Sequence, residues 1–422
     1  MIKYISRSSE IGNISARTIE KIKGYDVIKN VFQQQLQYLQ NNMGGMDHII
    51  PGFVLVGKKH HGKHFMVNIF LEAVRAEAFI ISDRMLSKDI DALRSYIDQT
   101  DKDKVAMIVL DQIDQMKGDQ VDNISQIVHA SEKRIYILGI SEEDGDMVKS
   151  CRSCGLIEYS IPVTDPFLKD SVEIIEDLIH NKYSWVKFDM SIEDMAAVVY
   201  SLPFCEVDRL VESSIRDSRS SNRKSVSEKC IIEAASRRYY CVNTVAEYQT
   251  KRKLTEACIH EVGHCIMAEL LAVNSVGYAY VGLKQNVSPL GYTSVIREDS
   301  EYKASKDEIR VLLAGIAAEE LCNSYISAGG GDDIKKVIDT LTSLAGNEAC
   351  FGLEYIDHYN VRSGEQQDWY VKEIRQLMQK TYDDVKEALN PFKDIINEAA
   401  KIMCSKGYLL GRELRDIMKQ CL

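Results

Sequence analysis

The segment His260-Glu261-Val262-Gly263-His264 constrains the fold most, because it sets two histidines and a glutamate inside an apolar helical pattern. Residues four apart lie on one face of a helix, so both imidazoles can face a single metal ion. Glu261 lies about 100° further round the helix, where its carboxylate can act on a water molecule as a general base. Glycine costs up to about 1 kcal/mol inside a helix, which predicts close packing at Gly263.

The alternative is a pair of histidines whose hydrogen bonds are satisfied inside a helical core. The chain holds nine histidines, and a chance match to this spacing is on the order of a one or two per cent event. The residues on both sides continue an apolar helical periodicity, which predicts a buried helix. Metal binding by His260 and His264 is therefore the favoured interpretation.

A catalytic zinc site needs a third protein ligand and an open coordination position. Four acidic residues downstream are candidates: Glu319, Glu320, Asp332 and Asp333. The two aspartates follow three glycines in SAGGGDDI, a segment whose backbone can approach a metal closely. They also begin a helical pattern, so N-capping is the alternative role for either one. Spacing alone does not select one of the four.

Length and composition indicate a soluble globular protein of two or three domains. The 422 residues exceed one ordinary core, and 45% are apolar and 27% charged. The net charge of -11 argues against a nucleic-acid binder. No stretch approaches the roughly 18 apolar residues that span a bilayer, so no transmembrane segment is predicted. The 11 cysteines form no regular framework, and we interpret them, including Cys151 and Cys154, as ordinary reduced thiols in a cytoplasmic protein.

The chain divides into three predicted domains: an α/β domain at 1–165, a helical lid at 166–245 and a mostly α-helical domain at 246–422. In the first, short apolar runs separated by helices predict a parallel sheet covered on both faces. The predicted strands there are Gly52–Val56, Ala78–Ser82, Val105–Leu110 and Arg134–Ile140, and the predicted helices are Asp26–Gln40 and His64–Ala76.

Helical patterns replace strand patterns after about residue 165. The predicted lid helices are Asp170–His180, Ser191–Ser201 and Val207–Arg216. The polar, Ser-rich stretch Arg216–Ser227 predicts an exposed loop. In the last domain the one predicted strand pair is Val276–Leu283 with Gly291–Ile296.

This order of segments resembles the FtsH family of AAA+ zinc metalloproteases. The match is strongest from Leu254 onwards, in HEVGH, LGYTSV, LLAGIAAEEL, AGGGDDI and the closing helices. The resemblance implies that Asp333 is the third zinc ligand and that Glu319 orients the ligands. It also implies that the strand Leu290–Val295 is an edge strand on which a peptide substrate pairs.

The first domain resembles an AAA+ module whose nucleotide site is degenerate. Gly57, Gly62 and Lys63 fit the phosphate loop G-x-x-x-x-G-K, and Asp111 keeps the acid that coordinates the metal. His64 replaces the Ser or Thr whose hydroxyl binds Mg²⁺, and Gln112 replaces the glutamate that activates water.

Other motor elements of the family also lack counterparts. Ser141 replaces the sensor asparagine, and Arg152 does not stand where an arginine finger would. The pore loop is missing between Ser82 and Lys104, and the family's transmembrane hairpin is absent. Arginine fingers alone contribute about 10³–10⁵-fold to phosphoryl transfer. We therefore predict a pseudo-ATPase, and weak ATP or ADP binding through Lys63 and the loop amides stays open.

Three histidines, His60, His61 and His64, cluster in and beside the phosphate loop. Such a cluster can bind a second metal, but no carboxylate is close in sequence. We therefore expect a solvated loop rather than a metal site.

Two functions compatible with the sequence come from different classes. The first is a zinc metalloendopeptidase that cleaves unstructured polypeptides or a dedicated protein partner without ATP hydrolysis. The second is a scaffold or regulatory subunit that assembles with an active FtsH-type protease. A third, narrower alternative is a nucleotide sensor that gates the peptidase. The family resemblance implies an oligomer, either a homo-hexamer or a hetero-oligomer with a related protease.

Overall fold

The computed structural model describes residues 16–41, 49–50, 52–84, 87–101, 104–239, 251–283, 289–297, 301–326, 330–347 and 364–421. These residues form two compact units. The first, here called the α/β unit, comprises residues 1–182 and 201–209, and the second, the helical unit, comprises residues 183–200 and 210–422. Helix α9 (Phe204–Ser220) contributes to both units. The predicted boundary at residue 245 lies outside the described residues, so the three-domain division stays a prediction.

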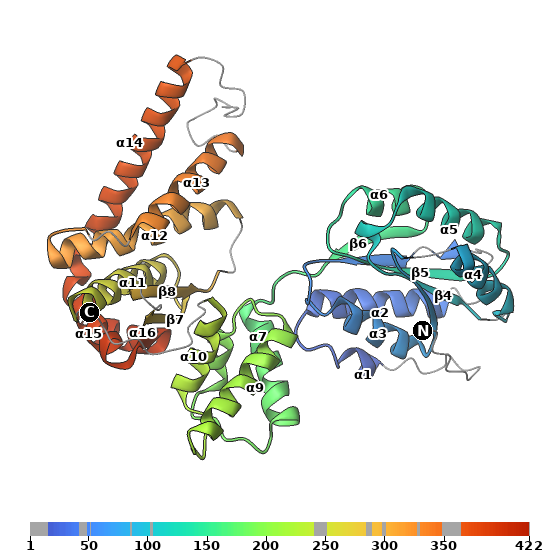
Figure 1. The fold of residues 1–422 in the computed structure, drawn as a ribbon, viewed down its shortest axis with the longest axis horizontal. Coiled ribbons are helices and arrows are strands. Elements are labelled where there is room, and N and C mark those ends of the chain that lie inside the picture. The colour runs from blue at the N-terminus through green and yellow to red at the C-terminus, as the bar shows by residue number, and fades with distance from the viewer. Residues whose placement is uncertain are drawn as a thin grey trace. The chain divides into compact units, whose positions relative to one another are not determined.

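The α/β unit is built on a parallel sheet with helices on both faces, as predicted (Figure 1). The strands are β1 (Ile49–Ile50), β2 (Gly52–Val56), β3 (Ala78–Ile81), β4 (Ala106–Leu110), β5 (Ile135–Ser141) and β6 (Ile157–Pro162). Their order is β3-β4-β5-β2-β6, and β1 pairs with β5. The helices are α1 (Ala16–Ile19), α2 (Asp26–Asn41), α3 (Lys63–Val74), α4 (Ser87–Gln99), α5 (Gly118–Ala130), α6 (Asp146–Ser153) and α7 (Leu168–Asp177).

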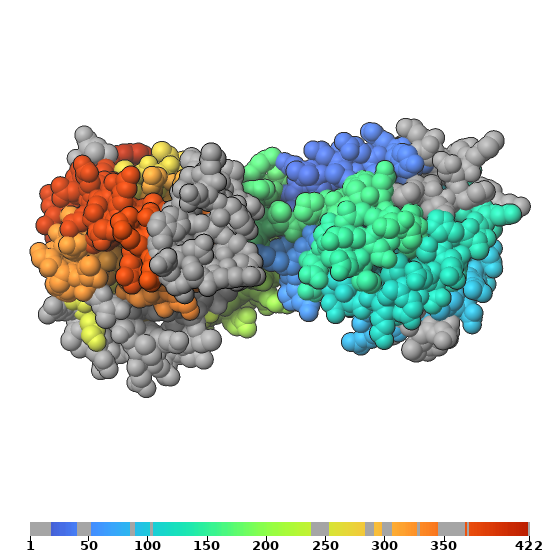
Figure 2. Space-filling view, turned by 90° about the horizontal axis from the view of Figure 1, so that it is seen from above, coloured from blue at the N-terminus to red at the C-terminus, as the bar shows by residue number. Residues whose placement is uncertain are grey.

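The residues of strand β4 show why helices cover both faces of the parallel sheet. All five of its residues are buried, and successive side chains of a strand point to opposite faces. Met107 packs with the α2 and α3 residues in one core cluster, whereas Ile108 packs with the α5 residues in another. In the space-filling view, the blue N-terminal residues and the turquoise later residues of this unit pack into one body (Figure 2).

The strand order also positions the predicted nucleotide-binding residues. Strand β2 lies between β5 and β6, and the phosphate loop follows it directly. Asp111 follows β4 and Ser141 ends β5. Because the strands are parallel, these residues gather at the carboxyl edge of the sheet, where open α/β sheets bind ligands.

The helical unit combines a small antiparallel sheet with long packed helices. The sheet order is β8-β7-β9, with bounds β7 (Val276–Leu283), β8 (Pro289–Val295) and β9 (Tyr408–Leu410). The helices are α8 (Ile192–Val198), α10 (Glu228–Tyr239), α11 (Lys251–Leu271), α12 (Glu301–Asn323), α13 (Gly331–Asn347), α14 (Gly364–Leu389), α15 (Lys393–Lys406) and α16 (Gly411–Cys421).

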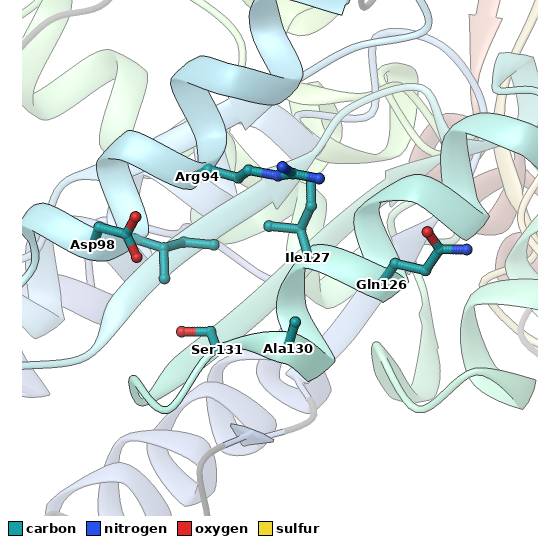
Figure 3. Close-up of a pocket in the computed structure, with 7 residues that line it drawn as sticks. Arg94, Asp98, Gln126, Ile127, Ala130 and Ser131 are labelled. Carbon is teal, nitrogen blue, oxygen red and sulfur yellow. The ribbon is translucent and has the colours of Figure 1, made fainter.

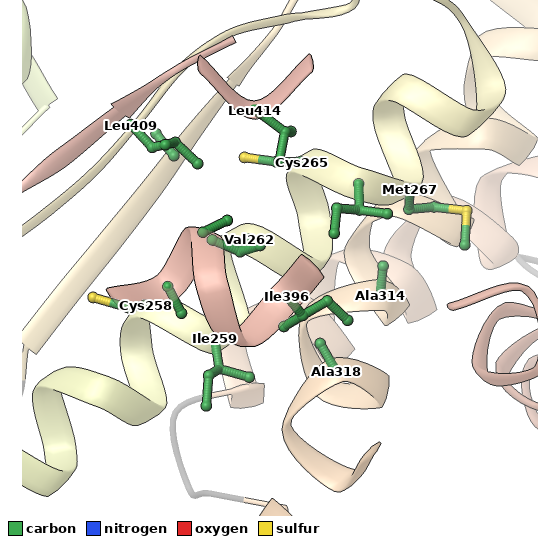
Figure 4. Packing of buried hydrophobic residues seen from close by; sticks show 14 of the residues in the cluster. Cys258, Ile259, Val262, Cys265, Met267, Ala314, Ala318, Ile396, Leu409 and Leu414 are labelled. Atoms are coloured by element: carbon green, nitrogen blue, oxygen red, sulfur yellow. The ribbon is translucent and has the colours of Figure 1, made fainter. Parts of the chain in front are cut away.

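Helix α11 is the centre of this unit. Its residues Cys258, Val262 and Cys265 are completely buried and share one core with Ala314 of α12 and Ile396 of α15 (Figure 4). A helix that is covered on several sides shows apolar residues all round. The prediction of a buried helix at HEVGH is therefore confirmed.

Gly263 lies where α11 and α12 cross. A Cβ atom at this position would lie 2.5 Å from the carbonyl oxygen of Ala314 and 2.5 Å from Cβ of Ala318. Only a residue without a side chain allows the two backbones to approach so closely. The predicted close packing at Gly263 is confirmed.

Several local features differ from the sequence prediction, among them two strands and one helix. Strands β6 and β9 were not predicted, because IEYSIP mixes polar and apolar residues and YLL is very short. Helix α9 continues to Ser220, into the segment predicted as a loop. The last turns of α9 are polar on their exposed side. A polar segment can therefore be the solvated face of a helix and not only a loop, which is why the prediction was wrong here.

Among the helices that the structure describes, none is both long enough and apolar enough to cross a bilayer.

Candidate metal centre

The two histidines of α11 are held by hydrogen bonds through their Nδ1 atoms. Nδ1 of His260 lies 2.7 Å from Oε1 of Glu319, and Nδ1 of His264 lies 2.6 Å from the carbonyl oxygen of Val311. Both partners belong to α12, which packs directly against α11. Metal-binding histidines typically donate one ring N–H to such an acceptor, which orients the ring and leaves the other nitrogen for the metal.

The free nitrogens of both rings meet Asp333, which stands in the first turn of α13. Oδ2 of Asp333 lies 2.9 Å from Nε2 of His260 and 3.5 Å from Nε2 of His264. Ligand atoms in a tetrahedral zinc site are separated by roughly 3.3 Å, given metal–ligand distances of about 2.0–2.1 Å. The donor set and its spacing therefore fit zinc.

A second observation supports the fit: two glycines stand where any side chain would clash with the groups of the site. A Cβ atom at Gly315 of α12 would lie 2.6 Å from Nε2 of His260 and 2.6 Å from Cε1 of His264. At Gly330, just before α13, it would lie 2.8 Å from Cγ1 of Ile316 and 3.8 Å from Cε1 of His260. The two glycines thus let α12 and the start of α13 approach the histidines. Residues 327–329 of the predicted Gly-rich segment lie outside the described residues.

The charges of the site are strongly coupled. Burial opposes protonation of His260, but hydrogen bonds to Asp333 and Glu319 outweigh it and raise its pKa to about 10. Burial opposes ionisation of Asp333, but the two histidines hold its pKa well below the usual range. One buried carboxylate, Glu319, and one partly buried carboxylate, Asp333, thus face two imidazoles, an arrangement that favours a cation between them, either a proton or a metal ion.

Glu261 lies beside the histidines and is held by strand β8. The side chains of His260, Glu261 and His264 are all buried, and their ligand atoms lie within 4.8 Å of one another. Oγ1 of Thr293 donates a hydrogen bond of 2.8 Å to Oε2 of Glu261. A Cβ atom at Gly291 would lie 2.0 Å from Oε1 of Glu261, so the carboxylate rests directly against the backbone of β8.

The other three acidic candidates for the third metal ligand do not lie where a ligand would. Glu319 lies against His260 with 1% of its surface exposed, in the position that the resemblance implied. Glu320 points away from the site and contacts Lys386 and Tyr382. Asp332 is exposed in the first turn of α13. The structure thus brings His260, Glu261, His264 and Asp333 together and leaves Glu320 and Asp332 outside.

Sequence reasoning missed three contributors: Thr293, Gly315 and the carbonyl group of Val311. LGYTSV was noted as a strand, but nothing local shows that its threonine faces Glu261. Gly315, the glycine of LLAGIAAEEL, was the one residue whose role could have been suspected from the sequence. A glycine inside a helix usually indicates close packing at that position.

The predicted nucleotide-binding residues gather at the edge of the sheet in the α/β unit. Gly62 begins α3 in the left-handed region with φ 80°. The ammonium group of Lys63 donates to the carbonyl oxygens of Gly57 and Lys58, the second at 2.8 Å. Nε2 of His64 lies 2.9 Å from Oδ1 of Asp111. His64 therefore contacts Asp111, the acid that in an intact phosphate-loop site would bind Mg²⁺ together with a Ser or Thr hydroxyl group.

The histidine cluster of the phosphate loop is less solvated than expected. The structure corrects the prediction for His61, which is 6% exposed and contacts the carbonyl oxygen of Val163 and a carboxylate oxygen of Asp165. The reason is that the loop folds back on the segment after β6, which is distant in sequence. His64 is largely exposed, and its contact with Asp111 raises its pKa.

A shallow depression of about 440 Å³ lies between α4 and α5 (Figure 3). Arg94 and Asp98 of α4 and Gln126 and Ser131 near α5 line it. None of the predicted site residues lines this depression.

Comparisons with known proteins point to one family. No family model matches the chain. It is 22% identical over 292 residues to the ATP-dependent zinc metalloprotease FtsH of Helicobacter pylori, covering 63% of this chain and 45% of that protein. It is 20% identical over 453 residues to FtsH of Clostridium perfringens, covering 96% of this chain and 62% of that protein. It is also 20% identical over 451 residues to FtsH 1 of Thermomicrobium roseum, covering 96% and 68%.

The chain spans about half the length of the first of these curated relatives, and somewhat more of the others. The similarity extends over both units, from the parallel sheet to the closing helices. Together with the arrangement of His260, His264 and Asp333 beside Glu261, this similarity supports membership of the FtsH family of zinc metalloproteases.

Proposed function

We propose that the chain is a zinc-dependent endopeptidase that cleaves unstructured polypeptides, or one dedicated protein partner, without hydrolysing ATP. The observation that carries this proposal is the convergence of His260, His264 and Asp333 beside Glu261. Two imidazoles and one carboxylate, with a glutamate next to them, are the ligand type and the general base of zinc peptidases.

In the proposed reaction, His260, His264 and Asp333 would hold a zinc ion, which would supply a Lewis acid for the scissile carbonyl and for the attacking water. Glu261 takes the proton of the attacking water and later gives it to the leaving amine. Thr293 holds the carboxylate of Glu261 in position through its 2.8 Å hydrogen bond. Glu319 fixes the ring of His260.

Strand β8 is the proposed binding surface for the substrate. Within the described part of the sheet it pairs with β7 alone, so it is an edge strand. Gly291 and Thr293 of β8 both contact Glu261. A peptide that adds to this edge as a further strand would therefore run past the general base. Pairing through the backbone tolerates many sequences, which fits an enzyme for unstructured chains.

The proposal that the chain does not hydrolyse ATP is supported by residues of the α/β unit. His64 and Asp111 contact each other where a hydroxyl group and a carboxylate would share Mg²⁺. Gln112 is an amide and cannot take a proton from water. Without a motor, the enzyme has no means of unfolding stable substrates.

The test is turnover of an unfolded model protein by wild type, by a chelator-treated sample and by Glu261→Gln. We expect Glu261→Gln to lose about 10²–10⁴-fold in rate, because the general base is removed. Glu256→Gln is the matched control, because Glu256 lies on the same helix and contacts Tyr325 instead of the metal site. Equal cleavage by all samples would show that the site is not catalytic.

The alternative is that the chain is a scaffold or regulatory subunit of an active FtsH-type protease. It is motivated by an α/β unit that keeps a complete sheet and two buried cores despite its altered nucleotide site. Saturable peptidase activity of the purified chain alone would make this alternative unnecessary. Particle mass in solution tests the proposed homo-oligomer, and fractionation of cells tests the proposed cytoplasmic location.

A further inference from the structure

A tyrosine outside the metal centre contacts the segment that directly follows strand β8. The hydroxyl group of Tyr200 accepts a hydrogen bond of 3.1 Å from the backbone N–H of Arg297 and donates one to the carbonyl oxygen of the same residue. One hydroxyl group can do both, because it has a donor and two acceptor lone pairs. Tyr200 stands two residues after α8, and Arg297 stands two residues after β8. Both belong to the helical unit.

Each partner in this contact is also held elsewhere. Helix α8 packs against β7, where a Cβ atom at Gly277 would lie 2.5 Å from the carbonyl oxygen of Ala197. The guanidinium group of Arg297 lies 3.2 Å from a carboxylate oxygen of Glu308 in α12. The contact between Tyr200 and Arg297 therefore joins two segments that are each fixed in place.

A neighbouring hydrogen bond shows which edge of the strand Tyr200 occupies. The N–H of Ile296 donates to the carbonyl oxygen of Ser275, just before β7, at 2.6 Å. In an extended segment, the N–H and C=O groups of one residue point to the same side, and those of the next residue point to the opposite side. Ile296 therefore faces β7, and Arg297 faces the other edge, where Tyr200 lies.

The register of the sheet extends this assignment back to Thr293. In β7, Val281 donates its N–H to the carbonyl oxygen of Gly407, beside β9, at 3.0 Å. Ala279 stands two residues earlier, so its backbone groups also face β9. Thr293 pairs with Ala279, and because Ala279 is turned to β9, Thr293 turns its own backbone groups away from β7. Val295 does the same, two residues further on.

We propose that Tyr200 ends the substrate-binding edge of β8, so that a bound polypeptide pairs with Thr293 and Val295 but not with Arg297. This inference rests on the proposed function, because it takes β8 as the strand to which the substrate adds. An added strand needs the outward N–H and C=O groups of its neighbour, and at Arg297 the hydroxyl group of Tyr200 already uses both. Tyr200 is therefore a specificity-determining residue.

The place of Tyr200 sets how much of the substrate is bound. Thr293 holds Glu261, and Arg297 follows four residues later, which is about 13 Å along a strand at about 3.3 Å per residue. About four substrate residues therefore fit between the general base and Tyr200. Residues beyond them leave the sheet, so recognition on this side of the scissile bond should saturate at about four residues.

The first measurement is hydrogen–deuterium exchange of single backbone amides, which needs no peptidase activity. The probe is an unstructured peptide cut from casein, added at saturation to the full-length Glu261→Gln variant. We expect the amide of Arg297 to exchange slowly with and without the peptide, whereas the amides of Thr293 and Val295 become protected when it binds. Protection of Arg297 that appears only with the peptide would overturn the proposal, as would unchanged exchange at Thr293 and Val295.

The second measurement is cleavage of casein peptides that share one scissile bond and are lengthened one residue at a time at either end. For the wild type, kcat/KM should rise with length and level off at about four residues on one side of the bond. Tyr200→Ala exposes the backbone groups of Arg297, so the plateau should move outward by about two residues. The gain in kcat/KM should be about two- to tenfold, the effect of one net hydrogen bond.

Tyr325→Ala is the matched control, because the hydroxyl group of Tyr325 contacts Glu256 in the same unit, and its plateau should stay in place. The outcomes separate this inference from the proposed function. A chain that cleaves no peptide but shows the expected exchange keeps the role of Tyr200 and loses the peptidase. A wild type whose kcat/KM keeps rising past four residues on both sides keeps the peptidase and overturns the role of Tyr200. Neither outcome depends on whether Tyr200→Ala folds.

Discussion

At the scale of single residues, the candidate metal centre depends on groups that touch the ligands rather than on the ligands alone. Glu319 orients the imidazole of His260, and the carbonyl group of Val311 orients that of His264. Thr293 holds the carboxylate of Glu261. Each of these contacts is a hydrogen bond to a charged or metal-binding group, which contributes more than an ordinary hydrogen bond. Their removal should therefore have separate, measurable effects.

Glu319→Gln should weaken zinc binding by about 10–100-fold, because the carboxylate that orients His260 and makes its Nε2 a better donor is lost. Competition with a chromophoric chelator measures the zinc affinity. Glu320→Gln is the control on the same helix, because Glu320 contacts Lys386 and Tyr382 outside the site. Equal zinc affinities of the two variants would show that Glu319 does not support the ligand.

Thr293→Val should lower kcat by about tenfold or more, because a hydrogen bond to a charged group contributes about 1.5–3 kcal/mol. Zinc content should stay unchanged, because Thr293 donates its hydrogen bond to Glu261 and not to a ligand. Thr293→Ser keeps the hydroxyl group and should restore most of the rate. A Ser variant as slow as the Val variant would mean that shape, not the hydrogen bond, matters at this position.

At the scale of elements, the site is made by three helices and one strand that meet at α11. Helix α11 supplies both histidines and the glutamate, α12 supplies the orienting groups, and α13 supplies Asp333. Strand β8 covers the glutamate. The geometry of the ligands is therefore set by how closely α11 and α12 cross, which depends on Gly263 and Gly315.

Gly263→Ala should destabilise the fold by about 1–3 kcal/mol, the usual cost of overpacking a core. The new Cβ would lie 2.5 Å from two atoms of α12, so the helices would have to separate. Thermal unfolding measures the effect. Gly118→Ala is the control, because a Cβ atom there meets nothing within 4 Å. An unchanged melting temperature for Gly263→Ala would contradict a tight crossing.

At the scale of the whole molecule, the chain combines a proposed peptidase site that has a complete candidate ligand set with an α/β unit whose proposed nucleotide site departs from the family pattern. The sheet of that unit keeps its buried core, but His64 contacts Asp111 and Lys63 donates to carbonyl groups of its own loop. The chain should behave as a peptidase without a motor.

The purified chain should hydrolyse no ATP above background and should cleave an unfolded substrate at the same rate with and without ATP. A stably folded version of the same substrate should not be cleaved, because the chain has no ATP-driven means of unfolding it. Phosphate release and gel-based cleavage assays measure the two activities. ATP-stimulated cleavage of the folded substrate would show that the α/β unit still works as a motor.

The sequence by itself determined what depends on local periodicity. The spacing of His260 and His264 places both on one helical face whatever surrounds the helix. Runs such as AMIVL predict buried strands because each of their residues is apolar, and β4 is indeed buried throughout. Strands β6 and β9 escaped prediction because one is mixed in polarity and the other has three residues.

Only the tertiary structure decided which distant groups meet. Spacing left Glu319, Glu320, Asp332 and Asp333 equivalent; their places depend on how α12 and α13 pack against α11. The same holds for Thr293 and Glu261, which are 32 positions apart in the chain. Periodicity fixes which face of a helix a residue occupies. Packing, which is set by close approaches at residues such as Gly263 and Gly315, fixes what that face touches.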